Sequence, residues 1–453
     1  MSNKDSIDWS KENINKLYLK ILIPTLIGMI STIIVTITDG YFVGQYAGSD
    51  ALAAVNIIAP IFLTSTAFAL LFGVGSSVVA AIHLSKGRTK AARINITQAV
   101  VVSEILFLLL SIFAFFNSEG VSLWLGATDR LLPLADSYLK ILSLSMIFYM
   151  LENLGLFTIR LDGSPNFAMM CTIVPAILNI IGDYYCIAVL DMGIEGAALA
   201  TAGSFVFGGI MVLIYLLFAS KTLKLYRIKL TRKSLKLTVR NIGYMCRLGF
   251  SAMLSEMTIA VMMFVGNYVF IRYFAEDGVA AFSTICYYFP IIFMVLNSMS
   301  QSAQPIISYN MGVGAHQRVR KAFHLTITYA VVFAACVIIG IYFFAPAMVG
   351  IFLISGTPAY NIAVEGMPYF SLGYIFLAIN MMYMGYYQSI ERYKTANIIA
   401  FVRGFVLLPI CFIVIPMILG SIGVWFAVPL VELLSVTFLL LVRILSIPKL
   451  NLS

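Results

Sequence analysis

Residues 17–43 read LYLKILIPTLIGMISTIIVTITDGYFV, a run of apolar and small side chains in which only Lys20 and Asp39 carry charge. About 20 predominantly apolar residues are enough for a helix to cross a bilayer. Similar runs recur along a chain that is 61% hydrophobic and only 11% charged, whereas soluble domains have about 25% charged residues. Barrel strands would be about 9–11 residues of alternating character. The sequence therefore predicts an all-α integral membrane protein.

These apolar runs predict twelve transmembrane helices. Their approximate bounds are 17–43, 51–84, 91–116, 133–158, 166–190, 194–219, 243–274, 279–308, 320–345, 360–389, 395–419 and 421–446. Lys and Arg gather in alternate loops, such as 85–93 and 221–240, while the opposite loops are mostly acidic. By the positive-inside rule, this alternation predicts that both termini are cytoplasmic. An even number of spans agrees with that prediction.

The two halves of the chain resemble each other. Residues 20–93 align with 247–320 without a gap, which pairs Tyr41 with Tyr268. Six helices in each half is an even number, so the repeat is predicted to be parallel, with its axis along the membrane normal. We predict five segments: a cytoplasmic tail (1–16), an N-terminal six-helix lobe (17–220), a basic cytoplasmic linker (221–240), a C-terminal six-helix lobe (241–446) and a cytoplasmic tail (447–453).

Four carboxylates lie well inside apolar runs: Asp39, Glu152, Asp183 and Glu256. A charge at membrane depth costs at least about 2.5–3.5 kcal/mol, and chains that keep one commonly use it to bind an ion, pass a proton or hold a substrate. The four acids are therefore the main candidates for function. Glu104 and Glu432 also fall within spans. They have no amide partner nearby in sequence, so we predict no functional role for them.

Amide and hydroxyl side chains accompany the acids of the first half. Asn179 and Asp183 are one helical turn apart and share a helix face. Oxygen ligands of this kind suit a small hard cation or a carboxylate that shares its proton. We predict ion binding, with Na⁺ as the only metal considered, at Asp39, Asn179, Asp183, Thr201, Asn153 and Glu152. The structural alternatives are an interfacial Asp39, a buried Asn179–Asp183 pair, and an ion pair between Glu152 and Arg160.

The second half contributes one acid of the seventh span, Glu256, beside Met257 in a methionine-rich segment. Soft thioethers and aromatic faces suit a pocket for lipophilic cations. We therefore predict substrate binding or coupling at Glu256, Met257 and Tyr41. For the methionine the alternative is ordinary helix packing.

Several functional classes are not expected. The chain has no G-x-x-x-x-G-K-[ST] loop and no soluble domain, so we expect neither a nucleotide nor another cofactor. Its basic residues lie in short loops and show no nucleic-acid signature. The spans show no nucleophilic side chain grouped with a general base, so we do not expect an enzyme. The expected partners are small organic cations and the lipid bilayer, the expected coupling ion is H⁺ or Na⁺, and the expected state is a monomer.

The order of several motifs resembles the MATE (multidrug and toxic-compound extrusion) family, above all its bacterial MepA-like and DinF-like branches. The matching segments are Asp39-Gly40-Tyr41-Phe42-Val43-Gly44, Arg160-Leu161-Asp162-Gly163-Ser164-Pro165, Asn179 with Asp183, and Gln304-Pro305-Ile306-Ile307-Ser308-Tyr309-Asn310. The resemblance implies a multi-pass protein of the bacterial inner membrane with two lobes. It also implies a cation site in the N-terminal lobe at Asp39, Asn179, Asp183, Thr201 and Asn153.

The residues and the resemblance together predict a cation-coupled (H⁺ or Na⁺) antiporter that exports lipophilic, mostly cationic drugs by alternating access. The alternative is a lipid-linked precursor or polysaccharide flippase of the same superfamily. A flippase would need a basic cavity for phosphate. Lys140 and Arg403 are the cationic residues within spans that could supply one.

Overall fold

The structure is a computed structural model that describes residues 8–228 and 231–446. The predicted C-terminal tail, the first seven residues of the predicted N-terminal tail and residues 229–230 of the linker lie outside the described residues. Within the described ranges, every regular element is a helix. The predicted all-α fold class is therefore confirmed.

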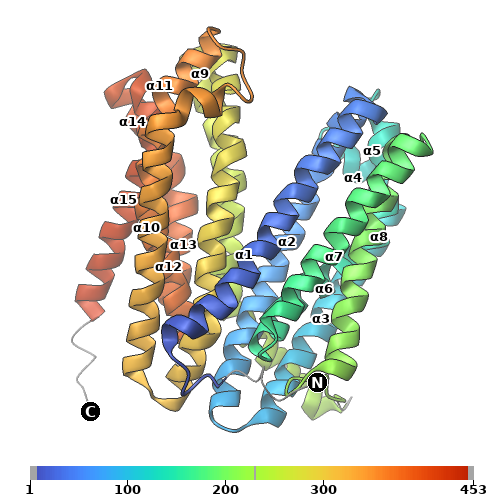
Figure 1. Cartoon of the computed structure of the whole chain (residues 1–453), viewed down its shortest axis with the longest axis vertical. Helices are drawn as coiled ribbons and strands as arrows, with labels where there is room; N and C mark the ends of the chain where they lie inside the picture. Colours follow the sequence, from blue (N-terminus) through green and yellow to red (C-terminus); the bar gives the residue numbers. More distant parts are fainter. Residues whose placement is uncertain (1–7, 229–230, 447–453) are drawn as a thin grey trace. The chain divides into compact units, whose positions relative to one another are not determined.

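The chain forms two compact units. Unit 1 takes in the described residues up to Gly249 together with Ser308–Ala315, and unit 2 takes in Phe250–Ile307 and the described residues from His316 onward. The helices of unit 1 are α1 (Ile14–Phe42), α2 (Ser49–Ser85), α3 (Thr89–Phe116), α4 (Ser118–Trp124), α5 (Leu132–Ser143), α6 (Met146–Leu161), α7 (Pro165–Asp183) and α8 (Gly193–Ile214) (Figure 1). Short π-helical segments continue three of them: η2 (Val43–Ala47), η3 (Tyr184–Val189) and η4 (Tyr215–Ala219).

The helix α9 (Arg232–Val313) begins in unit 1 and continues in unit 2. Ala275 divides it into two helices, because its φ of 53° is not helical. The other elements of unit 2 are α10 (His316–Val349), α11 (Pro358–Ser371), α12 (Gly373–Ser389), α13 (Tyr393–Phe401), η5 (Val402–Leu407), α14 (Leu408–Leu419) and α15 (Ser421–Ser446). The π-helical segment η5 joins α13 to α14.

The number of spans agrees with the sequence prediction. Among the described residues, 9 helical stretches are long and apolar enough to cross a membrane, or 11 when the bent pairs α5–α6 and α11–α12 each count as one span. The break at Ala275 divides the longest stretch in two, which gives twelve. The bends of 55° between α5 and α6 and 42° between α11 and α12 were not predicted.

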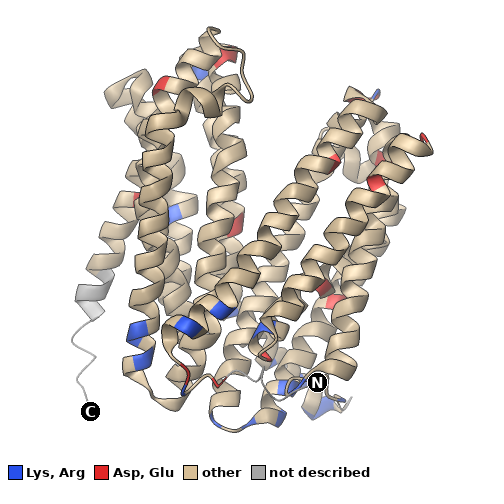
Figure 2. Cartoon of the chain, viewed as in Figure 1, with Lys and Arg blue, Asp and Glu red and all other residues tan. Residues whose placement is uncertain are grey.

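Charge is unevenly distributed along unit 1. Figure 2 shows most of its Lys and Arg residues at the end where α2 meets α3 and where α8 leads into the linker. At the opposite end, a buried apolar cluster joins α2, α5 and α8 and includes Ile58, Tyr138, Leu139 and Ala197. This core holds α5 and α8 in place next to the polar residues of α7. The cytoplasmic orientation of the basic end stays a prediction.

Candidate functional site

Helix α7 supplies two of the predicted ion-binding residues. Its buried stripe includes Cys171, Pro175, Asn179 and Asp183, at intervals of four residues. This spacing places the four side chains on one face, and α7 packs against both α1 and α8. Asp183 is the last residue of α7, directly before η3. Irregular π-helical turns of this kind are frequent at functional sites.

Helix α8 brings Thr201 to this face of α7. The side-chain amide of Asn179 donates a hydrogen bond to Thr201 Oγ1 at 3.4 Å. The two helices approach closely because Gly182 has no side chain. A Cβ atom at Gly182 would lie 2.9 Å from the Cβ of Ala200.

Asp39 and Tyr138 complete the group. Asp39 lies on α1, near the start of η2, and interacts electrostatically with Asp183. Tyr138 of α5 is buried and lies near Thr201 and both aspartates. We call Asp39, Tyr138, Asn179, Asp183 and Thr201 the acidic cluster.

Tyr138 was missed by the sequence analysis as a site residue. Its one visible signal in the sequence is a second tyrosine, Tyr369, 231 residues later in the other half of the chain, which does not indicate a role. The contact depends on the bend after α5 and on the packing of α5 against α8.

Four buried oxygens of the acidic cluster accept no hydrogen bond from the described residues: Asp39 Oδ1, Asn179 Oδ1, Asp183 Oδ1 and Asp183 Oδ2. Leaving a buried acceptor unsatisfied costs about 1–3 kcal/mol. Two neighbouring carboxylates also repel each other when both are ionised. A proton or a hard cation would relieve both costs. The oxygen set therefore fits either H⁺ or Na⁺.

The sequence profile of the MatE family matches residues 24–185 and 251–413. The chain belongs to the MatE family. The multidrug export protein MepA of Staphylococcus saprophyticus is 24% identical over 425 residues, which cover 91% of this chain and 90% of the relative. This MatE protein is a multi-pass protein of the bacterial inner membrane, as predicted.

Two solved structures share the fold. One is a MOP superfamily transporter from Pyrococcus furiosus, described as having a binding pocket of reverse polarity; it has a TM-score of 0.89, 22% identity, and coverage of 99% of this chain and 100% of its own. The other is a multidrug resistance MATE family transporter in an outward-facing conformation, with a TM-score of 0.88, 23% identity, and coverage of 99% and 100%.

Among the described residues, neither Glu152 nor Asn153 of this MatE protein forms a hydrogen bond with the acidic cluster. The amide of Asn153 donates to the backbone oxygen of Tyr149 at 2.9 Å. The carboxylate of Glu152 lies against Gly208 of α8, seven residues beyond Thr201. At about 1.5 Å per residue, that is roughly two helical turns from the cluster.

The three residues predicted to bind substrate lie in different environments. In unit 1, Tyr41 is 57% exposed and its ring packs against the neighbouring Phe42. In unit 2, Glu256 is buried while Met257 is exposed. Their predicted role in substrate binding or coupling stays a prediction.

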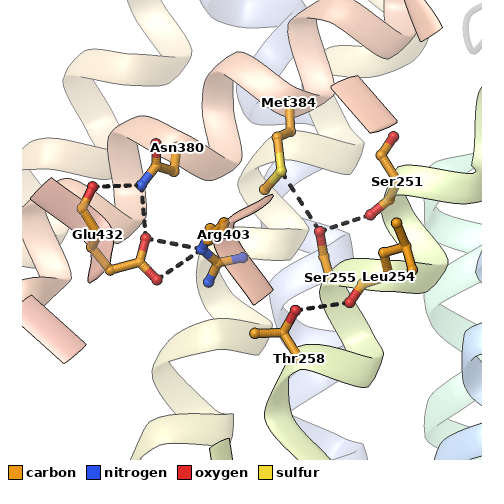
Figure 3. A network of polar contacts seen from close by, with 8 residues as sticks. All are labelled: Ser251, Leu254, Ser255, Thr258, Asn380, Met384, Arg403 and Glu432. Atoms are coloured by element: carbon orange, nitrogen blue, oxygen red, sulfur yellow. Dashed lines mark hydrogen bonds and ion pairs between the residues drawn. The ribbon is translucent and has the colours of Figure 1, made fainter. Parts of the chain in front are cut away.

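Unit 2 contains a buried polar network that the sequence analysis did not find (Figure 3). Arg403 of η5 donates from Nε to both carboxylate oxygens of Glu432 on α15, at 2.8 and 2.9 Å. Asn380 of α12 donates to the same carboxylate at 2.7 Å. On the α9 side of the view, the hydroxyl of Ser255 lies 3.8 Å from the sulfur of Met384. Glu432 does have an amide partner, but it comes from another helix.

Proposed function

We propose that this MatE protein is a cation-coupled antiporter that exports lipophilic, mostly cationic compounds in exchange for H⁺ or Na⁺. The observation that carries the proposal is the set of buried oxygens on Asp39, Asn179 and Asp183 that have no hydrogen-bond partner in the part of the chain that the structure describes. Such a set at membrane depth is suited to take up and release a cation. The similarity to the multidrug export protein MepA supports the choice of substrate.

The coupling step would act through α1. Asp39 and Asp183 lie on different helices, each close to a π-helical segment. A cation bound between the two carboxylates would draw α1 toward α7, because both carboxylates would be attracted to the same positive charge. Such a shift would let binding of the coupling ion favour one of two conformations, each open to a different side of the membrane. Alternating access requires such a change in conformation.

The flippase alternative is less well supported. Phosphate recognition calls for basic side chains with free donors. Lys140 is paired with Asp136 at 2.8 Å, and Arg403 is paired through Nε with Glu432 at 2.8 Å, although its buried Nη1 has no partner among the described residues. The oxygens of the acidic cluster that have no hydrogen-bond partner among the described residues belong to two acids and an amide, which favours a cationic cargo.

The test is efflux of ethidium from membrane vesicles that contain the protein, driven in turn by an imposed Na⁺ gradient and an imposed pH gradient. We expect one of the two gradients to drive efflux and Asp183→Asn to abolish it. The matched control is Asp191→Asn, the same change at an exposed residue whose φ of 52° asparagine tolerates.

Two results would count against the proposal. Wild-type vesicles that export ethidium under neither gradient would exclude this form of antiport. Full gradient-driven efflux by well-expressed Asp183→Asn would show that the acidic cluster is not the coupling site.

A further inference from the structure

Unit 1 contains a second acidic group that the acidic cluster does not use. Glu152 of α6 is only 9% exposed. Its carboxylate forms no hydrogen bond or ion pair with the part of the chain that the structure describes, and it interacts electrostatically with the buried Cys171 of α7. Buried carboxylates are normally paired. An unpaired one inside a membrane helix therefore points to a ligand.

The neighbouring helix makes room for this carboxylate. A Cβ atom at Gly208 of α8 would lie 2.3 Å from Glu152 Oε2 and 2.6 Å from its Cδ. The carboxylate therefore rests on bare backbone, and any larger residue at 208 would displace it. Gly203 on the same helix has no atom within 4 Å of such a Cβ. Position 203 is therefore open, whereas position 208 is closed by the Glu152 carboxylate.

Aromatic rings form the next layer of the same helix interface. The rings of Tyr149 and Phe205 lie 4.6 Å apart, and Phe62 of α2 lies 6.1 and 6.0 Å from them. Tyr149 precedes Glu152 by three residues, and Phe205 precedes Gly208 by three. Residues with this spacing are neighbours on a helix face. The carboxylate and the rings therefore occupy consecutive layers between α6 and α8.

We propose that Glu152 and the rings of Phe62, Tyr149 and Phe205 bind the positively charged group of a lipophilic organic cation. The inference rests on the proposed export function and assigns its substrate a site within unit 1. All three rings are partly exposed, and aromatic faces attract organic cations as a carboxylate does. A small hard ion is less suited to this site, because the rings supply no oxygen ligands.

This site is distinct from the acidic cluster. Gly208 follows Thr201 by seven residues on α8, and Cys171 precedes Asn179 by eight on α7. The separation along the helices is therefore about 11 Å. At an effective dielectric constant of about 20, two unit charges at that distance lower each other's affinity about tenfold. Substrate and coupling ion would then oppose each other's binding without sharing a ligand, and the effect would be reciprocal.

The test measures equilibrium binding of tetraphenylphosphonium to the purified full-length protein in detergent, with neutral triphenylphosphine oxide as the uncharged probe. Glu152→Gln preserves the shape of the side chain and removes its charge. We expect it to weaken tetraphenylphosphonium binding at least tenfold and to leave binding of the neutral probe unchanged. Gly208→Ala should also weaken binding of the cation, whereas Gly203→Ala should bind it like the wild type.

Asp183→Asn separates this inference from the proposed function. We expect this variant to lose gradient-driven efflux but to bind tetraphenylphosphonium at least as tightly as the wild type. If Glu152→Gln binds the cation within twofold of the wild type, or loses both probes equally, the site is wrong even where export is intact. If Gly208→Ala does not fold, the Glu152→Gln comparison of the two probes still decides the outcome.

Discussion

Arg403 and Glu432 form an ion pair inside unit 2 in which the guanidinium is 1% exposed and the carboxylate 3% exposed. Removing one partner of a buried pair leaves an uncompensated charge, which costs about 3–5 kcal/mol. The Asp50–Arg130 pair of unit 1 has the same N–O distance of 2.8 Å, but its side chains are 42% and 76% exposed. Exposed pairs contribute about 0–1 kcal/mol.

We therefore predict that Glu432→Ala lowers the unfolding temperature of the purified protein much more than Asp50→Ala does. Arg403→Met combined with Glu432→Leu should recover much of the lost stability, because neither charge is then left alone. Thermal unfolding in detergent measures all three variants. Equal unfolding temperatures for Glu432→Ala and Asp50→Ala would show that the buried pair does not stabilise unit 2.

Asp162 should fix the start of the linker. Its Oδ2 accepts from Tyr215 Oη, Ser220 Oγ and the Lys221 amide at 2.7–2.9 Å, and its Oδ1 accepts from the amides of Thr222 and Leu223 at 2.8 and 2.9 Å. Hydrogen bonds to a charged group contribute about 1.5–3 kcal/mol each. Asp162→Asn would turn an NH₂ group toward some of these donors.

We therefore predict faster tryptic cleavage of Asp162→Asn after Lys224 and Arg227 than of the wild-type protein, measured by mass spectrometry under native conditions. The control is Asp129→Asn, the same change at an exposed loop residue. Identical cleavage rates for all three proteins would show that the carboxylate does not hold the linker.

Tyr138→Phe tests the residue that the sequence analysis missed. The change removes the hydroxyl that lies near Thr201 and the two aspartates and preserves the packing of the ring. Losing a neutral polar contact of this kind costs at most about 1.5 kcal/mol, so half-maximal efflux should require up to about ten times more of the driving ion. Tyr360→Phe, which removes a hydroxyl bonded to the Pro346 oxygen in unit 2, is the control. An unchanged ion dependence in Tyr138→Phe would remove Tyr138 from the acidic cluster.

Gly182→Ala should disturb the acidic cluster without touching a polar group. The added methyl would meet the Cβ of Ala200 at 2.9 Å and push α7 away from α8. Overpacking of this kind costs about 1–3 kcal/mol, and it would lengthen the contact between Asn179 and Thr201. We expect reduced stability and reduced efflux, both measured against Gly203→Ala. Wild-type efflux by a stable Gly182→Ala protein would mean that the α7–α8 spacing is not critical.

Much of the fold could be predicted from local sequence. A helix in a bilayer must satisfy its own backbone, so long apolar runs alone locate the spans. The bends were not predicted because Leu144 and Leu372 lie within largely apolar sequence. Hydrophobicity alone does not show where a helix changes direction. The break at Ala275 was predicted only as a loop between two spans.

The candidate site was predicted less completely. Asn179 and Asp183 could be paired because one helical turn joins them, whereas the contacts of Tyr138 come from other helices. For the same reason Glu432 was given no role, since its amide partner Asn380 is 52 residues away in the chain. Glu152 was assigned to the ion site from its chemistry alone, and its position against Gly208 depends on the pairing of α6 with α8.

The sequence by itself determined that this protein is helical, that it crosses the membrane twelve times, and that a few acids lie where charge is costly. Those properties follow from composition and helical period, which can be read from each segment without knowing its neighbours in the fold. Only the tertiary structure decided which polar groups meet. It brought Asp39 near Asp183, paired Arg403 with Glu432, and placed the Glu152 carboxylate against Gly208, because contacts between helices depend on how whole faces pack.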